Sequence, residues 1–343
     1  MSRLKQIIRT GCISLSKSVV KDPLLRKKLI VDFYNTKAAC FSLFCKDDSY
    51  NPFEPSQSSL KNHFHVDELY RGNGLYGIGA GLRSFSGHSE PLAACIEHGL
   101  VLGDEFDKDM FDGALPSVIT MSDLRAQRFR NHGMHSIAVG PYIAYVEGAL
   151  SESEFSTLKS AFGRVLLVFP CHSIEENQTN NIDEPVLIRE CSRIVEENSI
   201  DTVVVSMYYN DFLMGRSRAF EKLGFKVFCA GNRYDPLFLS RLKSMLMLAD
   251  YCVTDGIGTH IGYALSLRKP MEVVGTSYLD VYVDELERNE AHEIAQALVS
   301  GCTVEHAAAV GSKYFNVGKE LSASQLATEL KLLDARLGAR QHA

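Results

Sequence analysis

The chain has 343 residues, enough for two domains of ordinary size that each bury a core of their own. Hydrophobic residues make up 45% and charged residues 23% of it, a composition typical of a globular rather than a disordered protein. The formal net charge of −6 argues against the strong basic field that nucleic-acid-binding proteins carry.

The first 31 residues are basic, with eight Lys or Arg residues against one acid, Asp22. A helix drawn through their start would have an apolar face made of Leu4, Ile7 and Ile8. Such a helix can pack on the protein with its basic side in solvent, which is the more common arrangement, or rest on an anionic membrane surface. We therefore predict a basic, helical segment over residues 1–60.

From about residue 94 the chain alternates apolar runs with helical patterns. We predict strands at residues 94–97, 117–121, 136–140, 164–169, 202–208, 226–230, 251–254 and 271–274. The helices predicted between them cover residues 123–131, 151–162, 183–198, 211–223, 236–249 and 258–268. This alternation is typical of βαβ units, and the continuous apolar runs indicate parallel sheets covered by helices on both faces. The expected fold class is α/β, with two Rossmann-like, doubly wound domains.

The domain junction is predicted between Gly148 and Gly163. Residues 61–150 would form an N-terminal Rossmann-like domain and residues 151–300 a C-terminal one, followed by a helical segment over 301–343. In that last segment one helical stripe is made of Leu326, Leu330, Leu333 and Leu337. At the junction Ser151 and Glu154 have the spacing of a capping box, which predicts a helix start.

Polar and titratable residues follow four successive strands of the predicted C-terminal domain. In open α/β sheets ligands bind beyond the carboxyl ends of the strands. The candidates for ligand binding are His172, Ser173, Tyr208, Asn232, Arg233, Asp255, Gly256, Gly258, Thr259 and His260.

The stretch Asp255–His260 carries the strongest single signal among them. A strand leads into a glycine-containing turn, and a helix is predicted to start near Gly258 or Thr259. Unpaired amides and the helix dipole favour a phosphate at such a start, and glycine lets the ligand approach the backbone. The alternative is an Asp-Gly turn with a capped helix and a structural histidine; the turn alone does not decide between them.

The wider stretch 251–270, YCVTDGIGTHIGYALSLRKP, resembles the donor-binding element of GT-B glycosyltransferases. The segment before it, AGNRYDPLFLSRLKSMLMLADYCVTD, is similar to bacterial proteins of lipopolysaccharide and capsular polysaccharide assembly. Phe169-Pro170 and His172-Ser173 are loosely similar to the histidine-containing turn of CMP-sialic-acid-dependent transferases. Here Cys171 separates the proline from the histidine. Residues 261–267 lack the acidic residue that many GT-B donor helices use to bind ribose.

The resemblance implies two Rossmann-like domains that face each other across a cleft, the N-terminal one for the acceptor and the C-terminal one for the nucleotide sugar. An inverting transferase needs a base to take the proton of the acceptor hydroxyl. The candidates near the first predicted strand are Glu90, Glu97 and His98, with His98 ahead because it follows the strand end. A histidine that is hydrogen-bonded in a turn is the competing interpretation.

The expected partners are a nucleotide-sugar donor and a glycan or lipid-linked acceptor, without nucleic acid and without a bound cofactor. Metal binding is not expected, because Asp107-Lys108-Asp109 lies in a charged loop and His63 and His65 have no third ligand at zinc-like spacing. Nine cysteines without a CxxC pair indicate reduced thiols, and hence a cytoplasmic protein, with peripheral contact at the inner membrane face as an option. Two other functions stay open: a non-hydrolysing UDP-sugar 2-epimerase and a noncatalytic binding protein of a polysaccharide assembly pathway.

Overall fold

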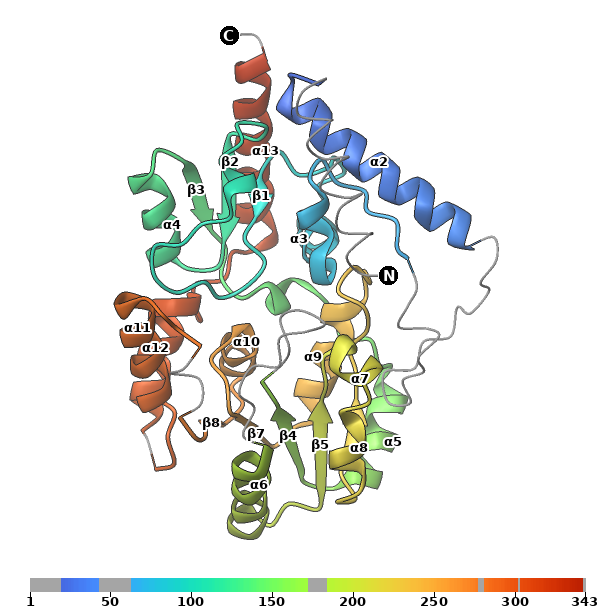
Figure 1. Cartoon of the computed structure of the whole chain (residues 1–343), viewed down its shortest axis with the longest axis vertical. Coiled ribbons are helices and arrows are strands. Elements are labelled where there is room, and N and C mark those ends of the chain that lie inside the picture. Colours follow the sequence, from blue (N-terminus) through green and yellow to red (C-terminus); the bar gives the residue numbers. More distant parts are fainter. Residues whose placement is uncertain (1–19, 43–62, 172–183, 277–280, 302, 342–343) are drawn as a thin grey trace.

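The computed structural model describes residues 20–42, 63–171, 184–276, 281–301 and 303–341, in which two parallel β-sheets are surrounded by helices (Figure 1). The C-terminal sheet comprises β4 (Val165–Phe169), β5 (Thr202–Ser206), β6 (Lys226–Phe228), β7 (Tyr251–Thr254) and β8 (Met271–Val273). Its strands lie in the order β6-β5-β4-β7-β8, and all neighbouring pairs are parallel. The order reverses between β4 and β7, so this sheet is doubly wound, as predicted.

Alternating side chains of β4 show why the apolar run is continuous. Val165, Leu167 and Phe169 join one buried cluster, with α9 (Phe238–Leu248) and α10 (Thr259–Ser266). Leu166 and Val168 join a second cluster, with α6 (Glu184–Asn198) and α8 (Ser217–Glu221). Both faces of the sheet are therefore covered by helices, which requires apolar residues at every position of the strand.

The N-terminal sheet is smaller. Its strands β1 (Cys95–Ile96), β2 (Ser117–Thr120) and β3 (His135–Ala138) lie in sequence order and are parallel. The strands pack against α4 (Asp123–Asn131) on one side and α3 (Ile78–Ser86) on the other. The strand order does not reverse within the described sheet, because the glycine-rich stretch before β1 forms the 3-10 helix η2 (Arg71–Gly77) and α3 rather than strands.

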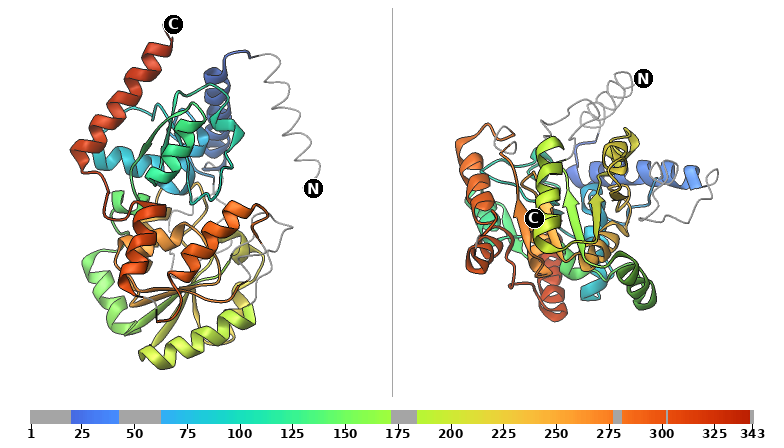
Figure 2. Two further views of the ribbon diagram at one scale, coloured as in Figure 1. Left: turned by 90° about the vertical axis from the view of Figure 1, so that its left-hand side faces the viewer. Right: turned by 90° about the horizontal axis from the view of Figure 1, so that it is seen from below.

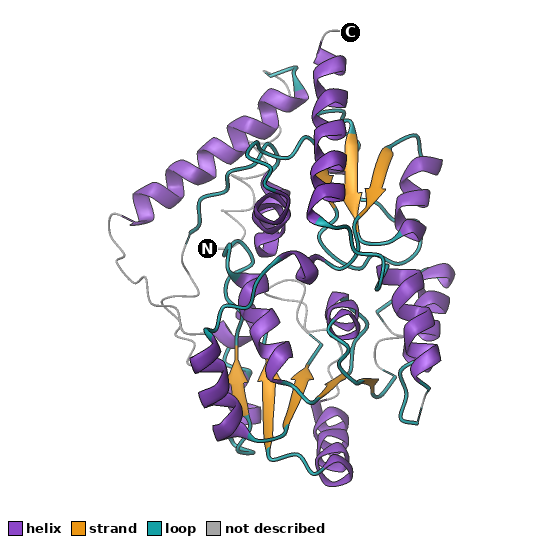
Figure 3. Cartoon of the chain, turned by 180° about the vertical axis from the view of Figure 1, so that it is seen from behind, coloured by secondary structure: helices purple, strands orange, loops and turns teal. Residues whose placement is uncertain are grey.

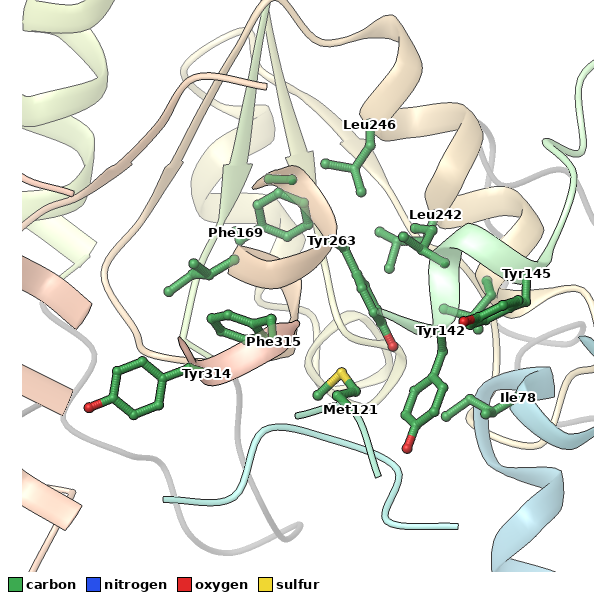
Figure 4. Packing of buried hydrophobic residues seen from close by; sticks show 14 of the residues in the cluster. Ile78, Met121, Tyr142, Tyr145, Phe169, Leu242, Leu246, Tyr263, Tyr314 and Phe315 are labelled. Carbon is green, nitrogen blue, oxygen red and sulfur yellow. The ribbon is translucent and has the colours of Figure 1, made fainter. Parts of the chain in front are cut away.

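The carboxyl ends of the two sheets point toward each other (Figure 3). Between the sheets a single buried cluster continues from one half to the other, with Met121, Tyr142, Leu242, Tyr263 and Phe315 among its members (Figure 4). Tyr142 belongs to the 3-10 helix η4 (Tyr142–Tyr145), which lies in the connection from β3 to α5 (Glu152–Phe162).

Three helices follow the C-terminal sheet: α11 (Glu285–Gln296), α12 (Val304–Phe315) and α13 (Ala323–Gln341). The last of them returns to the N-terminal half and packs beside α3 (Figure 2). The predicted stripe is its buried face, because Leu326, Leu330 and Leu333 are fully buried and Leu337 packs against them.

Helix α2 (Pro23–Ser42) is the described part of the basic N-terminal segment. It packs on the protein through Lys27, which is buried with its Nζ 2.8 Å from the Asp109 carbonyl oxygen and 3.0 Å from the Asp112 carboxylate. The predicted face of Leu4, Ile7 and Ile8 lies outside the described residues. In the described ranges we find no helix that is both long and apolar enough to cross a membrane.

Two local predictions differ from the structure. The helix predicted over 211–223 is split into α7 (Tyr209–Leu213) and α8, because Gly215 adopts a left-handed φ of 81° that ends the first helix. The helix predicted to start at Pro236 begins at Phe238, after a turn in which the Asp235 side chain accepts a hydrogen bond from the Leu237 amide.

Candidate functional site

The turn after β7 is hydrogen-bonded to the turn after β4, at the point where the strand order of the C-terminal sheet reverses. The backbone amide of Cys171 donates a hydrogen bond to the Asp255 carboxylate at 2.6 Å. A Cβ added to Gly256 would lie 3.3 Å from the Cys171 sulfur, so this turn has little room for a side chain. The reversal point is where open α/β sheets bind ligands. Asp255 and Gly256 follow β7, the strand that the sequence predicted before them, and the strand order puts that strand end at the reversal point.

His260 is held by two contacts at the same point. Its ring stacks on Phe169 with centroids 4.8 Å apart, and its Nε2 lies 3.0 Å from the Thr254 hydroxyl. That hydroxyl has one proton, which it donates to the Phe169 or the Gly256 carbonyl oxygen. We infer that Nε2 carries a proton and donates it to Thr254.

Helix α10 starts at this turn, with Gly258 as the residue before its first turn. Gly258 has no side chain that can accept from the first amides of the helix, and its φ of −164° is extended backbone. Thr259 directs its hydroxyl to the other half of the molecule, where it accepts a hydrogen bond from the Leu100 amide at 2.8 Å. The helix start therefore presents backbone amides next to the segment that follows β1.

Asp255 is buried, with 2% of its surface exposed, and only one of its carboxylate oxygens is occupied. The second oxygen, Oδ2, has no hydrogen-bond partner within the described parts of the chain. Burial raises the pKa of this carboxyl, which the Cys171 amide opposes. A buried acceptor of this kind is satisfied when a ligand donates a hydroxyl or an N–H to it.

His98 follows β1 and lies on the N-terminal side of the same region. The residue keeps part of its surface in solvent although protein surrounds its ring, and Gly99, the next residue, would place a Cβ 3.1 Å from the Thr259 hydroxyl oxygen. The surrounding protein desolvates the imidazole and lowers the pKa of His98; Asp107 opposes this shift and Arg233 adds to it. The ring is therefore neutral at pH 7 and able to accept a proton.

Neither Glu90 nor Glu97 offers a free carboxylate at this region. Glu90 lies before β1, toward the amino end of the strand, and interacts electrostatically with Asp334 of α13. The Glu97 carboxylate is buried and accepts hydrogen bonds from the Thr120 hydroxyl at 2.8 Å and the Arg125 guanidinium at 2.9 Å. Among the three candidate bases, His98 is the one that directly precedes the contact of Gly99 and Leu100 with Thr259 of α10.

Three of the other candidate ligand-binding residues follow strands that are not adjacent to β7 in the sheet. Tyr208 follows β5, and Asn232 and Arg233 follow β6, two and three strands away from β7. At the usual strand spacing this is about 10 Å for the first and about 14 Å for the others. His172 and Ser173 lie outside the described residues.

Of the aromatic residues near Arg233, the sequence pointed to Tyr208 but not to Tyr76. Tyr76 comes from the N-terminal half, and its amide donates a hydrogen bond to the Arg233 carbonyl oxygen at 2.5 Å. Arg71 lies between the rings of Tyr34 and Tyr234, 3.6 and 3.7 Å from their centroids. The available signal was the Gly72–Gly87 stretch, whose glycines permit this backbone path.

Asp107 lies in a charged loop at the surface, as expected. It is exposed, and its carboxylate accepts from the Asp109 amide at 2.9 Å, which caps the 3-10 helix η3 (Lys108–Met110). In the residues that the structure covers, no three His, Cys, Asp or Glu side chains are grouped closely enough to hold a metal ion.

Comparison with known proteins gives only distant structural similarity. No family model matches the sequence, and no curated protein matches it. A variant of the wall teichoic acid polymerase TagF aligns with a TM-score of 0.40 and 11% identity over 67% of this chain, and the match spans 60% of the polymerase. The UDP-GlcNAc 2-epimerase from Methanocaldococcus jannaschii aligns with a TM-score of 0.39 and 12% identity, over 75% of this chain and 74% of the epimerase. A similarity of this degree carries no argument about what this chain binds or catalyses.

Proposed function

We propose that this protein is a glycosyltransferase that moves a sugar from a nucleotide donor to a glycan or a lipid-linked acceptor of cell-surface polysaccharide assembly. One observation carries the proposal: the segment that follows β1 and contains His98 contacts the first turn of α10, at the reversal point of the C-terminal sheet. The hydrogen bond from the Leu100 amide to Thr259 ties these two segments together. In this proposal residues 61–150 bind the acceptor and residues 151–300 the donor.

The donor's phosphates would lie at the start of α10. The first amides of the helix and its dipole stabilise negative charge there, both in the bound donor and in the leaving phosphate. The unpartnered oxygen of Asp255 would accept a hydrogen bond from a donor hydroxyl. This gives the donor an acidic contact although residues 261–267 have none.

His98 would take the proton of the acceptor hydroxyl as the new glycosidic bond forms. A neutral imidazole at pH 7 suits this role, and its exposure leaves it accessible to an incoming acceptor. Catalysis would then combine positioning, base assistance and stabilisation of the leaving group.

The test begins with the melting temperature of the protein in the presence of CMP, CDP, UDP, UMP, GDP or ADP, since a ligand that binds only the folded state raises it. In Gly258→Asp we expect the nucleotide-induced shift to disappear, because the new carboxylate caps α10 and occupies the position of the phosphate. The fold should persist, because φ at Gly258 suits any residue and the new Cβ meets only the His260 ring, at 3.1 Å.

Gly258→Asn is the matched control, because it adds nearly the same volume without the charge. We expect at least a tenfold difference in nucleotide affinity between the two variants. Equal affinity in folded Gly258→Asp and wild-type protein would contradict the phosphate site.

The reaction is tested by nucleotide release. Release from a nucleotide sugar only when an acceptor is present supports transfer, whereas release from the donor alone favours the 2-epimerase alternative or hydrolysis. A protein that none of the nucleotides stabilises would instead be a noncatalytic binding protein.

A further inference from the structure

A cluster of four tyrosines surrounds Arg233 at the carboxyl ends of β5 and β6. Tyr208, Tyr209 and Tyr234 come from the C-terminal half, and Tyr76 comes from the N-terminal half. All four are half-buried and close enough to interact electrostatically with the guanidinium. We call these five residues the Arg233 cluster.

The guanidinium of Arg233 is available to a ligand. The side chain is exposed, and within the described ranges it forms no ion pair with a carboxylate. The nearest acid in sequence, Asp235, is buried and paired with Arg241 at 2.6 Å. Arg71 differs, because it is stacked between two rings and donates a hydrogen bond to the Tyr234 hydroxyl at 2.6 Å.

Tyr76 of the Arg233 cluster has a strained, left-handed backbone conformation. Tyr76 has a φ of 57°, which a bulky residue rarely adopts, and Gly77 has a φ of 74°. A Cβ at Gly77 would lie 2.2 Å from the Pro236 carbonyl oxygen, so the two halves touch at backbone level here. Residues held in such conformations concentrate at functional sites.

This conformation connects Tyr76 to both the cluster and the candidate base. Its ring centroid lies 6.0 Å from that of His98 and 4.8 Å from that of Phe238. A side-chain hydrogen bond links it to Tyr208. A ligand bound at the Arg233 cluster would therefore extend toward His98.

We propose that the Arg233 cluster binds an anionic saccharide, that is, a sugar unit carrying a carboxylate or a phosphate. A tyrosine side chain packs the apolar face of its ring against the C–H groups of a sugar, and its hydroxyl forms hydrogen bonds with the sugar oxygens. The planar guanidinium of arginine matches a carboxylate or a phosphate with two parallel hydrogen bonds. The proposal rests on the proposed function, in which this saccharide is part of the acceptor.

The anionic group at Arg233 is distinct from the donor phosphate. The start of α10 follows β7, and Arg233 follows β6, which lies three strands away in the sheet. At the usual strand spacing these two strand ends are about 14 Å apart, farther than one phosphate group spans. The proposal therefore assigns the donor phosphate to the start of α10 and the anionic group of the saccharide to Arg233.

The test measures saccharide binding to the full chain by ligand-observed saturation-transfer NMR, with glucose, glucuronic acid and glucose 6-phosphate as probes. We expect the wild-type protein to bind at least one anionic probe at least tenfold more tightly than glucose. In Arg233→Gln the ratio should fall to near one, while glucose binding is unchanged. Arg164→Gln is the matched control, because Arg164 is an exposed arginine directly before β4, at the opposite end of the same sheet.

Gly258→Asp separates this proposal from the proposed function. It should lose nucleotide binding and keep the preference for the anionic probe over glucose. A preference that survives Arg233→Gln, one that disappears only in Gly258→Asp, or no preference in the wild-type protein would each overturn the proposal. If nucleotides fail to bind but the Arg233-dependent preference persists, the donor assignment fails and the saccharide site stands. Preference for glucuronic acid alone identifies a carboxylate, and preference for glucose 6-phosphate alone a phosphate.

Discussion

Two charges of opposite sign, on Asp107 and Arg233, act on the pKa of His98, and this makes the role of His98 testable by pH. The protonated ring cannot act as a base, so kcat/KM should fall on the acid side of the pKa of His98 in the free enzyme. Desolvation lowers that pKa, so we expect activity to persist below the value of about 6.5 of an unperturbed histidine. The pH dependence of kcat/KM for transfer measures this limb.

Variants at the two charged neighbours should move the limb in opposite directions. Asp107→Asn removes the carboxylate that raises the pKa of His98, so the limb should move to lower pH. Arg233→Gln removes a cation that lowers this pKa, so the limb should move to higher pH. His98→Gln should lose the limb and about 10²-fold or more in rate. A limb that stays in place in both charge variants would assign the titration to another group.

At the level of single residues, the sequence was informative about which candidate residues lie at strand ends. His98, Asp255, Gly256 and Thr259 all follow predicted strands, and the structure places them at the facing ends of the two sheets. Tyr76 was not predictable, because its left-handed conformation accompanies contacts with the other half: its own amide bonds to the Arg233 carbonyl oxygen, and Gly77 lies against Pro236. Glu97 was a candidate base because it lies at the first predicted strand; the structure pairs its carboxylate with Arg125, 28 residues away.

Helix α5 shows how local chemistry sets the bounds of an element. The Ser151 hydroxyl accepts from the Glu154 amide at 3.3 Å, and the Glu154 carboxylate accepts from the Ser151 amide at 2.8 Å. The capping box predicted from the sequence is therefore present. Ser151→Ala should lower the free energy of unfolding by about 1 kcal/mol, because an amide at the helix start loses its acceptor.

The measurement is the urea midpoint at constant m-value. Ser156→Ala, at an exposed position inside the same helix, is the control and should be neutral or slightly stabilising. If both variants destabilise the protein equally, the capping contacts do not stabilise it.

The strands of the C-terminal sheet were predictable to within two residues because their apolar runs are bounded by glycine and polar residues. The helix predicted over 211–223 was not, because the left-handed turn at Gly215 leaves the apolar pattern on both sides intact. The hydrophobic periodicity of a sequence indicates which residues are buried, but it does not indicate a change in helix direction between them.

At the scale of the whole molecule, strand order was the missing information. The sequence placed Tyr208, Arg233 and Asp255 together because each follows a strand. The order β6-β5-β4-β7-β8 puts Asp255 at the reversal point and moves Arg233 to a separate cluster near Tyr76. No local pattern encodes this separation, since it results from which strands pair across the sheet.

The two halves share one buried core, which predicts that they unfold together. Residues of both sheets, such as Ile119 and Leu167, belong to the same cluster, and Phe315 of α12 fills the space beside Gly262 of α10, where a Cβ would lie 2.2 Å from its ring. Phe315→Ala should therefore cost about 3–5 kcal/mol of unfolding free energy and destabilise both halves. Hydrogen exchange across a urea series, read separately for β1–β3 and β4–β8, measures each half.

One common midpoint in the wild-type protein, shifted equally for both sheets in Phe315→Ala, is the expected result. Leu332→Ala, which removes a half-exposed leucine from α13, is the control and should change stability by less than about 0.5 kcal/mol. Two separate midpoints, or a shift confined to the C-terminal sheet, would show that the contact between the halves is weak. The hydrogen bond from the Leu100 amide to Thr259 would then be free to open and close, and the alignment of His98 with α10 would depend on bound ligands rather than on the fold.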